Sequence, residues 1–267
     1  MEKVGKVVDV FTYNGEKDIL EIHLNILAPF VDQFIIVESK TTFSGNKKPL
    51  YFSQHQHLFR KFYKKLTYFI IDEEYSDEER ELARNSPNTK GASHWENEFL
   101  QKESMKKALT HLQDDDIVLV GDVDEIIDPI ITHESKTPIK AKLRVYTYYL
   151  NNESSEQFYG TLIAEYKDIK GKVLNHIRSD KSLHSKGDYL GWHFTSMGGI
   201  KEVQRKLNDS YTTESYNTYK VQENLPHNIK ERKDFLGRNF TYTIDESHWP
   251  RYLKEHKDEY KHLLWQA

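Results

Sequence analysis

The stretch Ile117-Val118-Leu119-Val120-Gly121-Asp122-Val123-Asp124-Glu125 decides the fold class of this chain. It begins with a short apolar run, which is typical of a strand buried on both faces of a sheet. Three carboxylates follow directly. Because ligands in α/β proteins bind at the carboxyl ends of the strands, the stretch predicts an α/β fold with a chemical site where this strand ends.

The spacing of Asp122 and Asp124 indicates a metal site. In an extended backbone the two side chains project to the same side, so both carboxylates can face one hard cation. Such a site leaves coordination positions for water or for the oxygens of a diphosphate. We therefore expect Mn²⁺ or Mg²⁺ to bind here together with a phosphate-bearing ligand. The structural alternative is that the two acids only cap the following turn.

Strand and helix patterns alternate on both sides of this stretch, which predicts a doubly wound, mostly parallel sheet with helices on both faces. Before it, we predict strands at 4–11, 34–37 and 66–71 and helices at 17–27, 54–64 and 93–111. After it the pattern is mixed: strands at 139–150, 157–164 and 191–194, a helix at 200–207 and a C-terminal helix at 250–265. The charged segment 72–90 is interpreted as a solvated loop with no catalytic part.

Polar residues follow the first two predicted strands. Tyr13, Asn14 and Glu16 come after the first, and Glu38 ends the second. The carboxyl ends of parallel strands meet at one edge of a sheet, so these residues should converge with Asp122 on one crevice. We expect them to contact a nucleotide, although helix caps and surface acids are equally common at such positions.

The amino-acid composition excludes several classes of function. The chain has 267 residues, enough for one α/β domain, and a formal net charge of −4 without a long basic block, which argues against nucleic-acid binding. It has no cysteine, which excludes disulfides and thiolate chemistry. Neither a signal peptide nor a membrane-spanning stretch is evident, so we expect a soluble, cytoplasmic protein.

Several segments, taken together and in order, carry a resemblance to a known family. They are Asp9 to Glu16, Asp18 to Ile22, Phe34 to Ser39, Thr42 to Gly45, Lys48 to Phe52, Trp95 to Glu98 with Gln101-Lys102, Gly121 to Ile126, and Gly191 to Thr195. In order and spacing they resemble glycosyltransferase family 17, the β-1,4-mannosyl-glycoprotein β-1,4-N-acetylglucosaminyltransferases and their microbial and viral relatives. Lys102 stands where that family usually has Arg, which keeps the charge but loses the bidentate fork.

The resemblance implies a GT-A-type fold, a divalent cation, a UDP-sugar donor, most simply UDP-GlcNAc, a glycan acceptor and inversion at the anomeric carbon. We expect a single glycosyltransferase domain over 1–267. Residues 1–130 would form the nucleotide-sugar-binding half, and 131–267 the acceptor-side half with the C-terminal helix.

Further site residues follow from this reading. His193 is a candidate third metal ligand, and Trp95 and Trp192 could stack on the sugar or uracil ring, although hydrogen bonding and core packing are the ordinary roles of such residues. Lys102 could reach a donor phosphate with Glu98 beside it, although an i,i+4 ion pair explains the two equally well. Inversion needs a general base, for which the candidates are Glu214, Glu98 and Asp188.

Two other functions fit the acidic motif or the aromatic content. A metal-dependent phosphohydrolase acting on a nucleotide or phosphate ester also needs acids at a strand end, but two-metal sites usually have more ligands. A non-catalytic sugar-binding protein would need the aromatic residues but no site for a metal and a diphosphate. A transferase should bind a cation and a nucleotide in a manner that depends on Asp124, whereas a sugar-binding protein should not.

Overall fold

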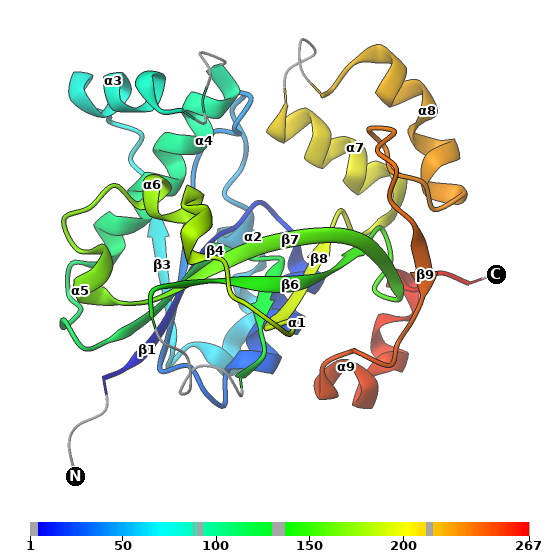
Figure 1. Cartoon of the computed structure of the whole chain (residues 1–267), viewed down its shortest axis with the longest axis horizontal. Helices are drawn as coiled ribbons and strands as arrows, with labels where there is room; N and C mark the ends of the chain where they lie inside the picture. Colours follow the sequence, from blue (N-terminus) through cyan, green and yellow to red (C-terminus); the bar gives the residue numbers. More distant parts are fainter. Residues whose placement is uncertain (1–4, 88, 90–92, 130–136, 212–215, 267) are drawn as a thin grey trace.

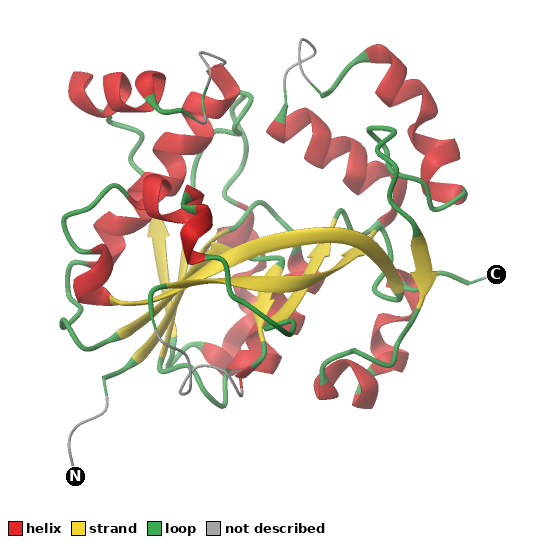
Figure 2. Ribbon diagram, in the orientation of Figure 1, coloured by secondary structure: helices red, strands yellow, loops and turns green. Residues whose placement is uncertain are grey.

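A computed structural model of the chain describes residues 5–87, 89, 93–129, 137–211 and 216–266. Within these residues nine strands form one sheet, with helices packed on both of its faces (Figures 1 and 2). This confirms the predicted α/β fold with a mixed sheet and is consistent with a GT-A-like arrangement. No helix in the described part of the chain has the length and apolar character needed to cross a membrane.

The amino-terminal half builds the parallel part of the sheet. Its strands lie in the order β3-β2-β1-β4, all parallel. The chain moves outward from β1 to β2 and β3 and then returns to the other side of β1 with β4, so the order reverses between β1 and β4. Ligands bind at such a reversal in open α/β sheets. The strands are β1 (Val7–Thr12), β2 (Gln33–Glu38), β3 (Leu66–Ile70) and β4 (Ile117–Asp122).

The second half extends the sheet with mixed pairing. β7 (Asn152–Glu165) lies antiparallel to β4 and carries β6 (Ile139–Thr147) on its other side. β8 (Gly191–Thr195) is parallel to β6, and the short β5 (Glu125–Ile127) pairs with β8 at the end of the sheet. β9 (Tyr242–Ile244) pairs with β7. Because Glu125 is opposite His193, the acidic motif lies directly beside β8.

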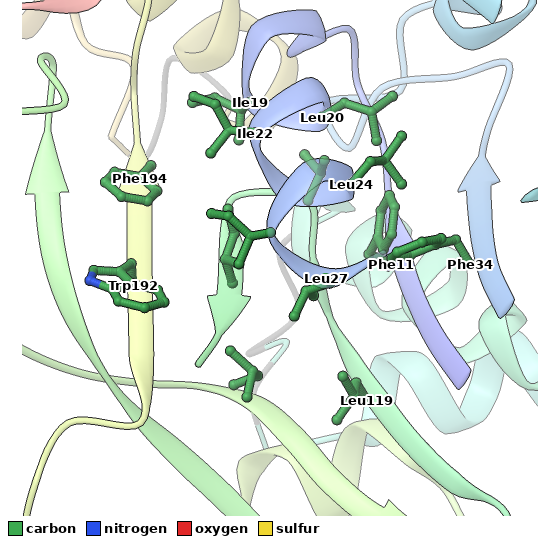
Figure 3. Close-up of a cluster of buried hydrophobic side chains, with 14 of the residues drawn as sticks. Phe11, Ile19, Leu20, Ile22, Leu24, Leu27, Phe34, Leu119, Trp192 and Phe194 are labelled. Atoms are coloured by element: carbon green, nitrogen blue, oxygen red, sulfur yellow. The ribbon is translucent and has the colours of Figure 1, made fainter. Parts of the chain in front are cut away.

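Alternating side chains along the strands give the sheet two buried faces. One face packs against α1 (Lys17–Leu27) and the C-terminal α9 (Arg251–Glu255), through residues that include Phe11, Leu20, Leu119 and Trp192 (Figure 3). The other face, with Val10 and Val120, packs against the segment that follows α4 (Ser93–Glu103) and against α5 (Tyr166–Ile169) and α6 (Leu174–Ser179). The apolar spacing of α1 at i, i+3 and i+4 explains why its predicted bounds agree with the structure.

The remaining helices have these bounds. They are α2 (Tyr51–His55), η1 (Gln56–Phe62), α3 (Asp77–Asn85), α4 (Ser93–Glu103), η2 (Ser104–Leu109), α5 (Tyr166–Ile169), α6 (Leu174–Ser179), η4 (Lys181–Leu183), α7 (Gly199–Ser210), α8 (Tyr219–Lys230) and η5 (Lys257–Leu263).

The elements differ from the sequence predictions in several places. The predicted helix 54–64 is divided into α2 and η1, and the predicted helix 93–111 into α4 and η2. Within 72–90, α3 replaces the expected loop, and it begins with a capping box in which Ser76 and Glu79 satisfy each other's backbone N–H groups. The predicted helix 250–265 is broken at His256 into α9 and η5. α8 was not among the predicted helices, and it contains Pro226, a residue that usually interrupts a helix.

Candidate functional site

A cleft opens at the carboxyl ends of β1, β2 and β4, where the strand order reverses. A small cavity of about 90 Å³ is lined by Tyr13, Asn14 and Ser39 together with Asp122 and Asp124. A larger cavity of about 450 Å³ shares the two aspartates, and its size lies within the range of about 300–1,000 Å³ typical of small-molecule sites. The predicted convergence of the first and fourth strand ends is therefore confirmed.

Asp122 ends β4 and is held from two sides. One carboxylate oxygen accepts a hydrogen bond from the Thr12 hydroxyl at 2.8 Å, across the β1–β4 pair. The other accepts from the Lys102 ammonium at 3.0 Å. Burial raises the pKa of Asp122, but the positive charges of Lys102 and Arg178 outweigh it, so the pKa lies below its usual value and the carboxylate is ionised.

Asp124 lies deeper, at the junction of the cavities, and is 6% exposed. Its Oδ2 accepts a hydrogen bond from the Lys206 ammonium at 2.8 Å, while the His193 imidazole lies 3.5 Å from its Oδ1. Burial raises the pKa of Asp124, but Lys206 and His193 outweigh it and hold the pKa well below its usual value. One oxygen of Asp124 therefore faces a lysine and the other faces a histidine.

His193 is placed by the register of β5 against β8. Its ring stacks on Phe158 with the centroids 4.1 Å apart, and its buried Nδ1 has no hydrogen-bond partner in the described part of the chain. Burial lowers the pKa of His193, but the carboxylates of Asp124 and Glu125 outweigh it and raise the pKa. The imidazole thus presents Nε2 to the acidic motif.

Glu125, the third acid of the motif, is buried in the wall of the larger cavity. Its Oε2 accepts from the Thr161 hydroxyl at 3.2 Å, and burial together with Asp122 raises its pKa. Two glycines make room for it. A Cβ at Gly121 would lie 2.9 Å from Glu125 Oε2, and one at Gly160 would lie 2.8 Å from the carboxyl carbon.

The residues present fit a single divalent cation only in part. Asp124 and His193 offer oxygen and nitrogen ligands close together, a mixture that suits Mn²⁺ better than Ca²⁺. Both carboxylate oxygens of Asp122 already accept hydrogen bonds, from Thr12 and from Lys102. The ammonium of Lys206 already neutralises the charge of Asp124. A cation at Asp124 and His193 therefore requires Lys206 to move aside and further ligands from water or a substrate.

Among the described residues, one group of three side chains could offer ligand atoms to a single metal ion, and it lies outside the cleft. It consists of Glu153, Asp245 and His248, on β7 and in the segment after β9. Arg144 donates to Glu153 at 2.9 Å, and His248 is exposed. None of the three lines the cavities that contain the acidic motif.

Polar side chains in the wall of the small cavity offer hydrogen-bonding groups to a nucleoside. The Asn14 side chain donates to Asp209 at 2.9 Å, and among the described residues its buried Oδ1 has no hydrogen-bond partner. Arg205, on α7, donates to both the Asn14 carbonyl and Asp209, which fixes α7 over the end of β1. Tyr13 and Glu16 also line this cavity, and Glu16 accepts from the Asn14 N–H at 3.0 Å.

The structure does not support a ligand contact for Glu38 or Trp192. The carboxylate of Glu38 is buried and accepts from Lys48, from the backbone N–H groups of Tyr51 and Phe52, and from the Tyr68 hydroxyl, so it holds the start of α2. Trp192 is 7% exposed, packs in the core beside α1 (Figure 3) and donates to the His248 carbonyl. Both side chains point away from the cleft because strand residues alternate between faces.

The other predicted residues are divided between the cleft and the surface. Trp95, Glu98 and Lys102 of α4 all line the larger cavity. Lys102 donates to both Glu98 at 2.7 Å and Asp122, so the i,i+4 ion pair and the contact with the acidic motif coexist. Asp188 is exposed and lines none of the cavities described here. Glu214 lies outside the described residues.

Three basic residues of the cleft were missed from sequence. They are Lys140 on β6, Arg178 on α6 and Lys206 on α7. No local pattern distinguishes them from surface cations, because each reaches the acidic motif only through the packing of a distant element. The figures place α6 and α7 on either side of the strand ends (Figure 1).

Comparison with known proteins agrees with this geometry. The model of the family described as glycosyltransferase family 17 matches residues 1–266. No curated protein and no solved structure matches the chain significantly. Since the family model spans nearly the whole chain, the protein belongs to glycosyltransferase family 17 and is a glycosyltransferase.

Proposed function

We propose that this protein is an inverting, metal-dependent transferase of GT-A type that moves a sugar from a UDP-sugar to a hydroxyl of a glycan. GlcNAc is the expected sugar, because the family resemblance points to UDP-GlcNAc. The whole chain acts as one domain, with the donor bound mainly by the half that carries β1 to β4.

One observation carries the proposal. An ionised Asp124, flanked by His193, lies at the point where the strand order reverses, and a small cavity with polar side chains in its wall adjoins a larger cavity at that point. This arrangement supports a nucleotide at the strand ends with its diphosphate over the acidic motif.

In this proposal, individual residues of the cleft have specific roles. Asp124 and His193 would hold Mn²⁺ or Mg²⁺, which supplies a Lewis acid that offsets the charge developing on the leaving diphosphate. Asp122 would accept from a ribose hydroxyl or a metal-bound water. The unpartnered Oδ1 of Asn14 would accept from the uracil N–H or a ribose hydroxyl. Lys102 would donate to a phosphate oxygen.

The proposed reaction also needs a general base on the acceptor side of the site. A general base must face the anomeric carbon from the side opposite the diphosphate. Of the candidates, Glu98 lines the larger cavity, so it is our choice, while Glu214 remains a candidate by sequence alone. Trp95 lies in the same wall and would pack against a sugar ring.

A donor screen tests the proposal. UDP release from UDP-GlcNAc, UDP-GalNAc, UDP-glucose and UDP-galactose would be measured with a mixture of oligosaccharide acceptors, in Mn²⁺ and in EDTA. We expect release from UDP-GlcNAc that EDTA abolishes. Release of inorganic phosphate in place of UDP would identify a phosphohydrolase and overturn the proposal.

A further inference from the structure

Arg178 is a nearly buried cation that is only loosely paired with carboxylates. Its side chain is 12% exposed, and the nearest carboxylate oxygens are those of Asp122 at 3.9 Å and Glu125 at 4.0 Å, beyond hydrogen-bond distance. Within the described residues no hydrogen bond reaches its guanidinium group. A guanidinium group has five donors, and leaving them unsatisfied in a buried position costs free energy.

Lys140 is a second, partly buried cation of this cavity. Its ammonium lines the same cavity, and in the part of the chain that the structure describes it makes neither a hydrogen bond nor an ion pair. Burial, and after it the positive charge of Arg178, lower the pKa of Lys140. Two like charges that face one cavity repel each other unless an anion lies between them.

The other two cations of the cavity differ from this pair. Lys102 donates to Glu98 and Asp122, and Lys206 donates to Asp124, all at 3.0 Å or less. These lysines therefore offset the acidic motif. Among the described cations that line the cavity, Arg178 and Lys140 are the two whose side chains make no hydrogen bond, so an incoming anion would meet them first.

Arg178 is also held in place. It lies at the end of α6, whose first two backbone N–H groups donate to the two carboxylate oxygens of Glu103 at 3.0 Å each. The Asn175 side chain donates to the Phe99 carbonyl at 2.9 Å, which ties α6 to α4 a second time. Preorganisation of this kind lowers the entropy lost when a ligand binds.

We propose that Arg178 and Lys140 form the binding site for the diphosphate of the nucleotide donor, with Arg178 as its main anchor. The inference rests on the proposed function, since it assigns the phosphates of the same donor. The planar fork of Arg178 matches two phosphate oxygens at once, whereas Lys140 acts as a point charge. Arg178 thus supplies the bidentate contact that Lys102 cannot make.

Calorimetric titration of UDP, uridine and inorganic pyrophosphate in the presence of Mn²⁺ tests this site. Wild type would be compared with Arg178→Gln, Arg178→Lys and Lys140→Gln. Matched controls are Arg144→Gln and Lys142→Gln, which remove the same charges from β6 at positions that do not line the cavity. Circular dichroism melting would verify that every variant is folded.

We expect Arg178→Gln to weaken UDP binding by about ten- to a hundredfold, from the loss of charge-assisted hydrogen bonds. Lys140→Gln should weaken it less, Arg178→Lys should restore part of the loss, and uridine binding should not change. If wild type binds UDP and folded Arg178→Gln binds it equally well, the inference is wrong while the proposed function stands.

A failure of the proposed function would give a different result from a failure of this inference. If wild type binds pyrophosphate in a manner that depends on Arg178 but does not bind UDP, the anion site is real and the nucleotide donor is wrong. If wild type binds neither pyrophosphate nor UDP, both are overturned.

Discussion

The ammonium of Lys206 lies 2.8 Å from Oδ2 of Asp124, the carboxylate at the centre of the cleft. The same ammonium donates to the Thr195 hydroxyl at 3.1 Å, so α7 is tied to both the acidic motif and the end of β8. Burial lowers the pKa of Lys206, but Asp124 and Glu16 outweigh it and raise the pKa, which keeps the lysine charged. Asp124 is thus neutralised by a residue of its own chain.

This pair predicts that Lys206 competes with a divalent cation. We expect Lys206→Met to tighten Mn²⁺ binding in the absence of nucleotide by at least about tenfold, because a positive charge within 3 Å of the carboxylate is removed. Manganese electron paramagnetic resonance would measure the free ion. Lys142→Met, the control on β6, should leave the affinity unchanged. Equal or weaker Mn²⁺ binding by Lys206→Met would refute a cation site at Asp124.

The hydrogen bonds of Glu38 predict a structural role for this acid. Glu38→Gln replaces an ionised acceptor of four hydrogen bonds by a neutral amide, and we expect the free energy of unfolding to fall by about 2 kcal/mol. Urea denaturation would measure it, with Glu81→Gln on the exposed side of α3 as the control. UDP affinity of the folded variant should stay within about twofold of wild type. Unchanged stability with weakened UDP binding would instead return Glu38 to the nucleotide site.

The positions of Glu98 and Asp188 predict different effects on turnover. If Glu98 is the general base, Glu98→Gln should lower the rate of sugar transfer by about a hundredfold while UDP affinity is kept. Asp188→Asn is the matched control, since this exposed acid lines no described cavity, and its rate should equal that of wild type. UDP release and UDP titration would be measured side by side. A parallel loss of affinity and rate would mean that Glu98 only positions Lys102.

Periodicity and strand ends account for the part of the structure that the sequence predicted. α1 agrees with its expected range because its apolar face is wide and regular, and β4 ends at the acidic motif as expected. Six of the nine residues of α3 are charged, so the Ser76 and Glu79 capping box is the clearest sequence signal for this helix. β5 has three residues, too few for a periodic signal.

The residues of the candidate site also differ in whether the sequence could predict them. Asp122, Asp124 and Asn14 could be predicted because each follows a recognisable strand. Glu38 and Trp192 were misplaced, because strand alternation turned them away from the cleft and the phase of that alternation depends on tertiary packing. Arg178, Lys140 and Lys206 could not be predicted, since non-local packing alone brings them to the acidic motif.

The most direct test of the proposed function is calorimetric titration of UDP with and without Mn²⁺. It would be performed on the wild type, on Asp124→Asn and on Asp115→Asn, whose exposed side chain lies in the turn before β4. We expect wild type and Asp115→Asn to bind UDP only with Mn²⁺, and Asp124→Asn to bind about a hundredfold more weakly or not at all. UDP binding that is independent of both Mn²⁺ and Asp124 would contradict the metal-dependent nucleotide site.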